Sequence, residues 1–376
     1  MKILITGGLG LLGGRLGAYF HSNKHSVTLA TRRNFISSQA SHIPNIKVID
    51  WSSREKLEKL CKSNDLVIHS AGISSTECER RPEESIKASS LNSQNLIDAS
   101  VSMGVKSFIY LSSAHVYTKN MEGIIDESSP TTNNHPYAQS HLHAEGEVLS
   151  SKHTGKINVK VLRLSNCFGY PVFKNSNAWT LIANDLCRQA VSNGSLLLNS
   201  NINTQRDFLP IEELCKIINR LFERNTFDEN QTIFNLGSGV TLTLFQLGEI
   251  IQKVSQEILG LSPSLYSSSS SIDSKLNPFL YKSKFLNMNN NNASSIYIPR
   301  NVKRLSITLR HAKLKPKSIL TTTTMMKQRM DVQEEEDDDD DCIILNQEAM
   351  NELKRREIIW YKNICENKND IEQYVW

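Results

Sequence analysis

The residues with the clearest chemical potential are three evenly spaced glycines, Gly7, Gly10 and Gly13, near the start of the chain. They follow a largely apolar run at residues 1–5 and precede a helical pattern at residues 15–20. Between a strand and a helix, the first glycine permits a tight turn and the second lets the backbone approach a pyrophosphate. The third lets the helix lie close to the strand. The spacing therefore predicts a turn that binds the phosphates of a dinucleotide.

The start of the helix after this turn adds an attraction for anions. The N–H groups of Leu11 and Leu12 have no acceptor within the helix, so we expect them to face the phosphates. The helix dipole places partial positive charge at the same end. The turn is thus predicted to bind a ligand and not only to shape the chain.

The end of the second predicted strand indicates which dinucleotide is bound. A carboxylate there would hydrogen-bond the ribose 2′-hydroxyl of NAD, but the sequence has Thr31, Arg32 and Arg33. Two guanidinium groups suit a 2′-phosphate. NADP is therefore favoured, and NAD stays possible if the arginines only stack on adenine or face solvent.

The elements that position these residues alternate between strand and helix over residues 1–165. The β-branched, nearly continuous apolar strands are typical of a parallel sheet covered on both faces. We therefore predict an α/β fold with a doubly wound parallel sheet (Rossmann), whose ligand crevice lies above the glycine turn. The strand candidates are residues 2–5, 26–30, 47–49, 66–69, 107–111 and 159–164, and the clearest helix is 89–103.

Three parts are expected along the chain. Residues 1–165 form the dinucleotide-binding Rossmann core, and residues 166–287 form a smaller substrate-binding α/β part packed against it. Residues 288–376 form a low-complexity charged tail with eight successive carboxylates at 334–341, a composition typical of disorder. The tail is predicted to be a flexible appendage with a terminal helix at 346–365, or alternatively a module that binds an unknown partner.

Composition limits the class of protein. A net charge of +4 over 376 residues is too small to indicate a nucleic-acid partner, and no apolar run approaches the ~20 residues of a membrane span. Seven cysteines without Cys-x-x-Cys pairs predict free thiols and no zinc. No histidines have metal-ligand spacing, so no metal site is predicted. Since the first strand begins at the N-terminus without room for a signal peptide, we expect a cytoplasmic protein.

Three motifs together resemble a known family. They are the Gly-x-x-Gly-x-x-Gly spacing after Thr6, the Ser-Ser-Ala-His-Val-Tyr segment at 112–117, and the helical segment at 136–145. The chain resembles the extended short-chain dehydrogenase/reductases, the NAD(P)-dependent epimerase/dehydratase family that acts on nucleotide sugars. The likeness spans residues 1–287. It implies that Ser113 orients the substrate and that Tyr137 is the catalytic acid/base.

The third motif departs from the family at its fourth position after the tyrosine. Relatives carry a lysine there, which lowers the pKa of the tyrosine and holds the nicotinamide ribose, whereas this chain has His141. A phenol is a weak base at neutral pH, and a cation one helical turn away favours the phenolate. Three possibilities stay open. His141 is protonated in the complex, or it is a neutral donor that leaves Tyr137 with an alkaline optimum, or the site binds cofactor without turnover.

Further roles follow from the resemblance. It implies that Asp50 contacts adenine, that the small Ala71 makes room for the cofactor, and that Asn166 bonds a nucleotide-sugar phosphate. It also implies that Arg206 meets the substrate diphosphate; the alternative is a surface pair with a neighbouring carboxylate. Trp51 is expected to be a packing residue.

The predicted function is therefore an NAD(P)-dependent epimerase or oxidoreductase that transfers hydride on a nucleotide sugar. Ala114 follows Ser113 where a dehydratase would carry an acidic pair, so dehydration is disfavoured. His115 is expected to face the loop. The alternatives are a catalytically weak or inactive NADP(H)-binding regulatory or scaffold protein, or the same chemistry on a non-nucleotide ketone.

The resemblance also implies a possible homodimer through the Tyr137 helix, with Leu142 and Val148 as contact or core residues.

Overall fold

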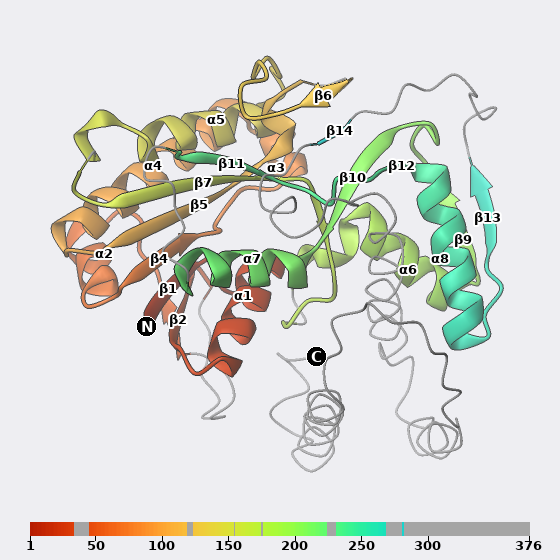
Figure 1. Ribbon diagram of the computed structural model, residues 1–376, viewed down its shortest axis with the longest axis horizontal. Coiled ribbons are helices and arrows are strands. Elements are labelled where there is room, and N and C mark those ends of the chain that lie inside the picture. The colour runs from red at the N-terminus through yellow and green to blue at the C-terminus, as the bar shows by residue number, and fades with distance from the viewer. Residues whose placement is uncertain are drawn as a thin grey trace, which may run out of the picture.

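The computed structural model describes residues 1–33, 45–118, 123–153, 155–173, 176–223, 231–267 and 280–281. The predicted tail at 288–376, with its expected terminal helix, lies outside these residues. The ribbon in Figure 1 shows the large sheet on one side and the smaller part on the other.

A seven-stranded sheet in the order β11-β7-β5-β4-β1-β2-β3 carries the fold. Every neighbouring pair is parallel, which confirms the predicted doubly wound parallel sheet. The strands are β1 (Lys2–Thr6), β2 (Ser26–Thr31), β3 (Asn45–Val48), β4 (Leu66–His69), β5 (Ser107–Ser113), β7 (Asn158–Leu164) and β11 (Ile233–Leu236).

Helices cover both faces of this sheet (Figure 1). α1 (Leu11–Ser22) and α7 (Ile211–Glu223) pack on one face. α2 (Arg54–Cys61), α4 (Pro82–Ser102) and α5 (Pro136–Val148) pack on the other, and the short α3 (Ser75–Arg80) precedes α4. Alternation along β1 supplies both cores, since Ile3 and Ile5 join the first cluster and Leu4 joins the second.

The order of the strands places the ligand crevice. From β1 the chain adds β2 and β3 on one side, and it then returns to add β4, β5, β7 and β11 on the other. At such a switch point the loops after neighbouring strands diverge and leave room for a ligand at the carboxyl ends. The glycine turn follows β1 at this point.

A smaller part covers the crevice. Its three-stranded sheet has the order β12-β10-β8, and a pair β13-β9 lies beside it. A third apolar cluster holds it together. Its elements are β8 (Asn166–Phe168), α6 (Ile182–Asn193), β9 (Ser195–Leu198), β10 (Gln205–Pro210), β12 (Thr241–Thr243), α8 (Leu244–Leu259) and β13 (Ser264–Ser267).

The remaining elements are short. They are β6 (Ile124–Ile125), which pairs with β14 (Leu280–Tyr281), and the 3-10 turns η1 (Ala114–Val116), η2 (Ser151–His153) and η3 (Asn177–Thr180). None of the helices in the described ranges has the length and apolar character needed to cross a bilayer.

The structure differs from the sequence prediction where the two parts meet. Residues 233–236, expected within the substrate-binding part, form the edge strand β11 of the main sheet by pairing with β7. α7 likewise packs on the main sheet. Of the two residues considered for a dimer contact, Val148 is completely buried in the core, and Leu142 packs partly buried against the cluster around Val116.

Candidate active site

The glycine turn forms a cradle in which two positions have no room for a side chain. Gly7 has φ +67°, and a Cβ there would lie 2.8 Å from the backbone N of Ala71. A Cβ on Gly13 would lie 2.4 Å from the carbonyl oxygen of Gly7. Only Gly tolerates the positive φ at Gly7 and the lack of space for a Cβ at both positions without a shift of the backbone. The close approach of α1 to β1 that the sequence predicted is therefore present.

The cradle opens into a large cavity. The cavity has a volume of about 1420 Å³, and Gly10, Leu11 and Leu12 line it. Gly10 is the N-cap of α1 and supplies no side-chain cap. The first N–H groups of the helix are thus available to an anion at the end where the dipole is positive.

A smaller cavity of about 240 Å³ continues from the first toward β2 and β3. Thr31, Arg32, Arg33 and Ala71 line it, and both arginines also line the large cavity. The two arginine side chains are exposed at the rim. The structure thus brings four predicted cofactor residues to one place.

Asp50 lies elsewhere. Its carboxylate accepts hydrogen bonds from the Ser52 N–H (3.1 Å), the Ser52 hydroxyl (2.7 Å) and the Lys56 ammonium (2.9 Å). These bonds lower its pKa to about 2. Trp51, expected to be a packing residue, lines the smaller cavity with its ring centre 5.7 Å from that of His69. The structure therefore brings Trp51, and not Asp50, to the wall of this cavity.

Ser113 and Tyr137 meet in the large cavity. Ser113 ends β5, Tyr137 lies in the first turn of α5, and both line the cavity. Burial raises the pKa of Tyr137, and the hydrogen bond with Ser113 acts in the opposite direction. The phenol is therefore protonated at neutral pH in the free protein, and the bond to Ser113 orients its hydroxyl.

His141 lies one helical turn after Tyr137. The two rings meet edge to face with centres 4.7 Å apart. Nδ1 of His141 is 2.8 Å from the hydroxyl oxygen of Tyr110. Burial lowers the pKa of His141 to about 4, and the nearby His115 acts in the same direction. The free protein therefore has a neutral imidazole where a lysine would place a cation.

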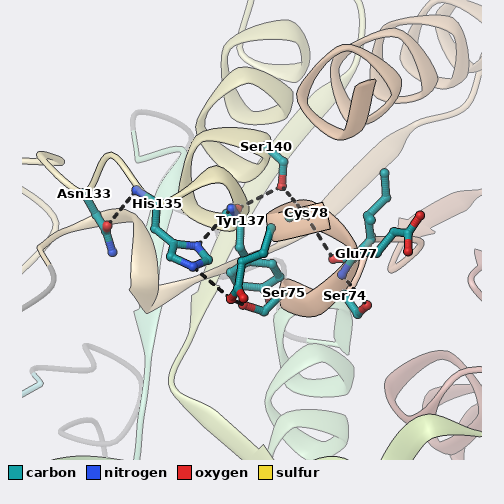
Figure 2. A network of polar contacts seen from close by, with 10 residues as sticks. Ser74, Ser75, Glu77, Cys78, Asn133, His135, Tyr137 and Ser140 are labelled. Atoms are coloured by element: carbon teal, nitrogen blue, oxygen red, sulfur yellow. Dashed lines mark hydrogen bonds and ion pairs between the residues drawn. The ribbon is translucent and has the colours of Figure 1, made fainter. Parts of the chain in front are cut away.

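A polar network fixes the start of α5 (Figure 2). His135 is the N-cap, and its Nδ1 accepts the N–H of Tyr137 at 3.2 Å. Its Nε2 contacts Glu79 of α3 at 3.1 Å. The Ser140 hydroxyl donates to the carbonyl oxygen of Tyr137 at 2.8 Å. The backbone of Tyr137 is thus held on both sides, and part of the support comes from α3.

Asn166 and Arg206, which the sequence analysis expects to bind substrate, also line the large cavity. The Asn166 amide donates to the carbonyl oxygen of Asp207 at 3.1 Å, and Nη1 of Arg206 donates to the carbonyl oxygen of Gln205 at 2.9 Å. Burial lowers the pKa of Arg206. None of the ion pairs found among the described residues includes Arg206. Its guanidinium can therefore serve an anionic ligand.

The neighbouring carboxylate is already bound elsewhere. Asp207 accepts hydrogen bonds from the Ser165 hydroxyl (2.6 Å), the Ser238 hydroxyl (2.9 Å) and the Gly239 N–H (2.8 Å). A surface pair between Arg206 and Asp207 is therefore not formed.

His115 was expected to face the loop. It lines the large cavity, and its ring centre is 6.0 Å from that of Tyr137 in an edge-on arrangement. Across the described part of the chain, no group of three or more His, Cys, Asp or Glu side chains is placed to hold a metal ion.

Comparison with known proteins decides the family. Residues 3–237 match the model of the NAD dependent epimerase/dehydratase family, and this match covers more than half of the chain. The chain belongs to this family. Its glycine turn fits the pyrophosphate of the family's dinucleotide, because Gly10 lines the cavity without a side chain at the start of α1.

Curated relatives of the family are similar at low identity. UDP-glucose 4-epimerase of Bacillus subtilis is 25% identical over 282 residues, covering 68% of this chain and 82% of the epimerase. Low-salt glycan biosynthesis protein Agl12 of Haloferax volcanii is 24% identical over 262 residues, covering 67% and 81%. dTDP-glucose 4,6-dehydratase of Streptomyces niveus is 22% identical over 267 residues, covering 67% and 77%.

Solved structures share the fold. UDP-N-acetylglucosamine 4-epimerase from Methanobrevibacter ruminantium M1, in complex with UDP-N-acetylmuramic acid, matches with a TM-score of 0.64 at 22% identity. The match covers 82% of this chain and 97% of the epimerase. MoeE5 in complex with UDP-glucuronic acid and NAD also has a TM-score of 0.64, at 19% identity, with 83% and 100% covered.

Proposed function

We propose that this protein is an NAD(P)-dependent enzyme that transfers hydride on a nucleotide sugar, as an epimerase or an oxidoreductase. The observation that carries the proposal is one shared cavity. The glycine cradle, the Ser113–Tyr137 pair and Arg206 all line it. A dinucleotide and a substrate with a phosphate group can therefore meet beside one phenol.

The residues divide the chemistry between them. A nicotinamide bound in the cavity supplies the acceptor and the donor of the hydride. Ser113 holds the reacting hydroxyl, and Tyr137 takes its proton in oxidation and returns a proton in reduction. His141 contacts the edge of the Tyr137 ring and offers a neutral imidazole to the ribose.

The substrate class is supported by charge and by relatives. Arg206 is half-buried and lines the cavity, where a diphosphate can accept a bidentate pair of hydrogen bonds. Asn166 adds a second polar side chain there. Relatives named as UDP-glucose 4-epimerase and dTDP-glucose 4,6-dehydratase act on nucleotide sugars. Ala114 at the position after Ser113 favours epimerase or reductase chemistry over dehydration.

For the cofactor we propose NADP in preference to NAD. Arg32 and Arg33 lie at the rim of the smaller cavity, and the last residue of β2 is Thr31 and not an acidic residue. Fluorescence titration with NADPH and NADH measures this preference. Tighter binding of NADPH supports it, and tighter binding of NADH contradicts it.

A cofactor-binding protein without turnover is the second candidate. This candidate is favoured by the neutral state of His141. Because burial keeps the imidazole uncharged, no cation at this position lowers the pKa of Tyr137. The two candidates share the cofactor and differ in the reaction.

One experiment separates them. Native mass spectrometry of the purified protein shows whether a dinucleotide is retained and whether it carries a 2′-phosphate. The same sample is then incubated with UDP-glucose or dTDP-glucose, and Tyr137→Phe serves as the control. Conversion that depends on Tyr137 supports the enzyme, and retained cofactor without conversion supports the second candidate.

A further inference from the structure

We propose that Tyr110 is a positioning residue that fixes the tautomer of His141, so that Nε2–H is a donor on the wall of the cofactor cavity. The inference deepens the proposed function, on which the role of that donor rests. The tautomer itself is a property of the free protein. It can therefore be measured independently of any ligand.

Geometry joins the two side chains inside the protein. Tyr110 stands on β5 and is 3% exposed, while His141 on α5 is 8% exposed. The Tyr110 oxygen and Nδ1 of His141 are 2.8 Å apart, and the ring centres are 5.9 Å apart. This is a full hydrogen bond shielded from water.

The direction of this bond follows from what else the phenol can reach. Burial raises the pKa of Tyr110 well above its ordinary value, so its hydroxyl keeps its proton. Among the described residues, His141 is the one hydrogen-bond partner of that hydroxyl. A buried donor is almost always satisfied. Tyr110 therefore donates to Nδ1, and the proton of the neutral imidazole stands on Nε2.

Other polar groups nearby are committed elsewhere. Nδ1 of His69 is 2.7 Å from the Thr6 hydroxyl, and its Nε2 is 3.1 Å from the Ser93 hydroxyl. The Glu145 carboxylate accepts hydrogen bonds from Ser112 and Arg163. Neither group is left to compete for Tyr110 or His141. His69 and Glu145 therefore do not take the hydrogen bond between Tyr110 and His141.

The position of His141 between the two cavities lets its Nε2–H donate to a bound dinucleotide. His141 lines both the large cavity and the smaller one, so its ring stands where the two cavities meet. A dinucleotide that spans both must pass this ring. A lysine there would supply a donor and a charge together, whereas an Nε2–H supplies the donor alone. The Tyr110–His141 pair can thus orient the dinucleotide by a hydrogen bond, but it supplies no positive charge to lower the pKa of Tyr137.

The test is nitrogen NMR of the protein labelled with ¹⁵N-histidine. The signals of His141 are identified by their loss in His141→Gln, since the chain has ten histidines. We expect the free protein to show a protonated Nε2 and an unprotonated, hydrogen-bonded Nδ1. In Tyr110→Phe the Nδ1 signal should shift and the Nδ1–H form should increase.

Tyr117→Phe is the matched control. Tyr117 is also completely buried, and its hydroxyl donates to Asn235 at 2.6 Å, away from His141. It should leave the His141 signals unchanged. A protonated Nδ1 in the free protein, or identical His141 spectra in Tyr110→Phe and the wild type, would overturn the proposal.

A second measurement tests the donor. Titration of the labelled protein with NADP⁺ should shift the Nε2 signal, and Tyr110→Phe should bind NADPH about 3- to 10-fold more weakly, as expected for one hydrogen bond. Binding that leaves the Nε2 signal in place contradicts the role of the donor. Absence of any dinucleotide binding contradicts the proposed function, while the spectra of the free protein still decide the tautomer.

Discussion

Tyr137 works in surroundings that favour its neutral form. Burial raises its pKa, the Ser113 hydrogen bond lowers it, and the neighbouring His141 carries no charge at neutral pH. In the proposed reaction, proton removal by this phenol therefore needs either alkaline conditions or positive charge supplied by a ligand.

We predict that the rate of alcohol oxidation rises with pH through the alkaline range. Restoring the cation by His141→Lys should move this rise toward lower pH by about one to three pH units, because a nearby positive charge favours the phenolate. The measurement is the pH profile of kcat/KM for the wild type and the variant. His143→Lys, on the same helix but exposed, is the control. Superimposable profiles for wild type and His141→Lys would contradict this account of Tyr137.

Residues that belong to a recognisable motif could be predicted from the sequence. The three glycines, Ser113, Tyr137, His141, Asn166 and Arg206 were all expected, and the structure brings them to one cavity. Tyr110 and His135 were missed, because their importance depends on partners distant in sequence or on a cap geometry that no spacing reveals. Trp51 was expected to be a packing residue and His115 to face the loop, and only the folded chain shows that they line cavities.

Among the elements, α5 is held to the sheet by a buried ion pair. Nη2 and Nε of Arg163 on β7 lie 2.6 and 3.0 Å from the Glu145 carboxylate. The Ser112 hydroxyl on β5 donates to the same carboxylate at 2.5 Å. The Arg163 guanidinium also lies 4.9 Å from the centre of the Tyr117 ring. Three elements, α5, β5 and β7, are therefore joined at Glu145.

Removing one member of this pair leaves a buried charge without a partner. Arg163→Met should lower the free energy of unfolding by about 3–5 kcal/mol, as measured by urea denaturation. Arg54→Met removes an exposed pair with Glu58 on α2 and should change the midpoint little. Equal effects of the two substitutions would show that the buried pair does not hold α5.

The glycine turn between β1 and α1 predicts how a single added methyl group affects dinucleotide binding. Gly13→Ala places a Cβ 2.4 Å from the Gly7 carbonyl oxygen, so the cradle must deform and dinucleotide binding should fall by at least tenfold. Gly146→Ala on α5 meets nothing within 4 Å and should leave binding unchanged while stabilising the helix by about 0.5–1 kcal/mol. Isothermal titration with NADPH compares the two. Undiminished binding by Gly13→Ala would place the phosphates elsewhere.

Strands of the first βα units were predicted well. β1, β2, β4 and β5 lie within a few residues of their expected positions. The role of β11 was not predicted, because a four-residue strand with three apolar side chains carries no information about which sheet it joins. Its pairing with β7 is decided by α7, which packs beside α1 and returns the chain to the main sheet.

At the scale of the whole molecule, buried neutral histidines couple stability to pH. Burial lowers the pKa of His69 to about 3 and that of His141 to about 4. Below pH 6.5 the unfolded chain binds protons at these histidines that the folded protein does not bind. Stability is therefore complete above pH 6.5 and is lost as the pH falls toward the folded pKa values.

Each such histidine should remove up to about 2 kcal/mol of stability between pH 6.5 and pH 5. His69→Gln should reduce this loss, even if it lowers stability at neutral pH. Urea midpoints at both pH values measure the difference for each variant, with the exposed His143→Gln as the control. The same pH dependence in the wild type and His69→Gln would show that His69 is not the group that resists protonation.

In the proposed reaction, Tyr137 and a nicotinamide dinucleotide act together on a nucleotide sugar in the large cavity. The most direct measurement is the fluorescence of reduced dinucleotide after mixing the purified protein, NADP⁺ or NAD⁺, and UDP- or dTDP-glucose in a single turnover. We predict a signal with the wild type that disappears in Tyr137→Phe, while dinucleotide binding persists. An equal signal from Tyr137→Phe, or a wild type that binds both ligands without any reduction of the dinucleotide, would contradict it.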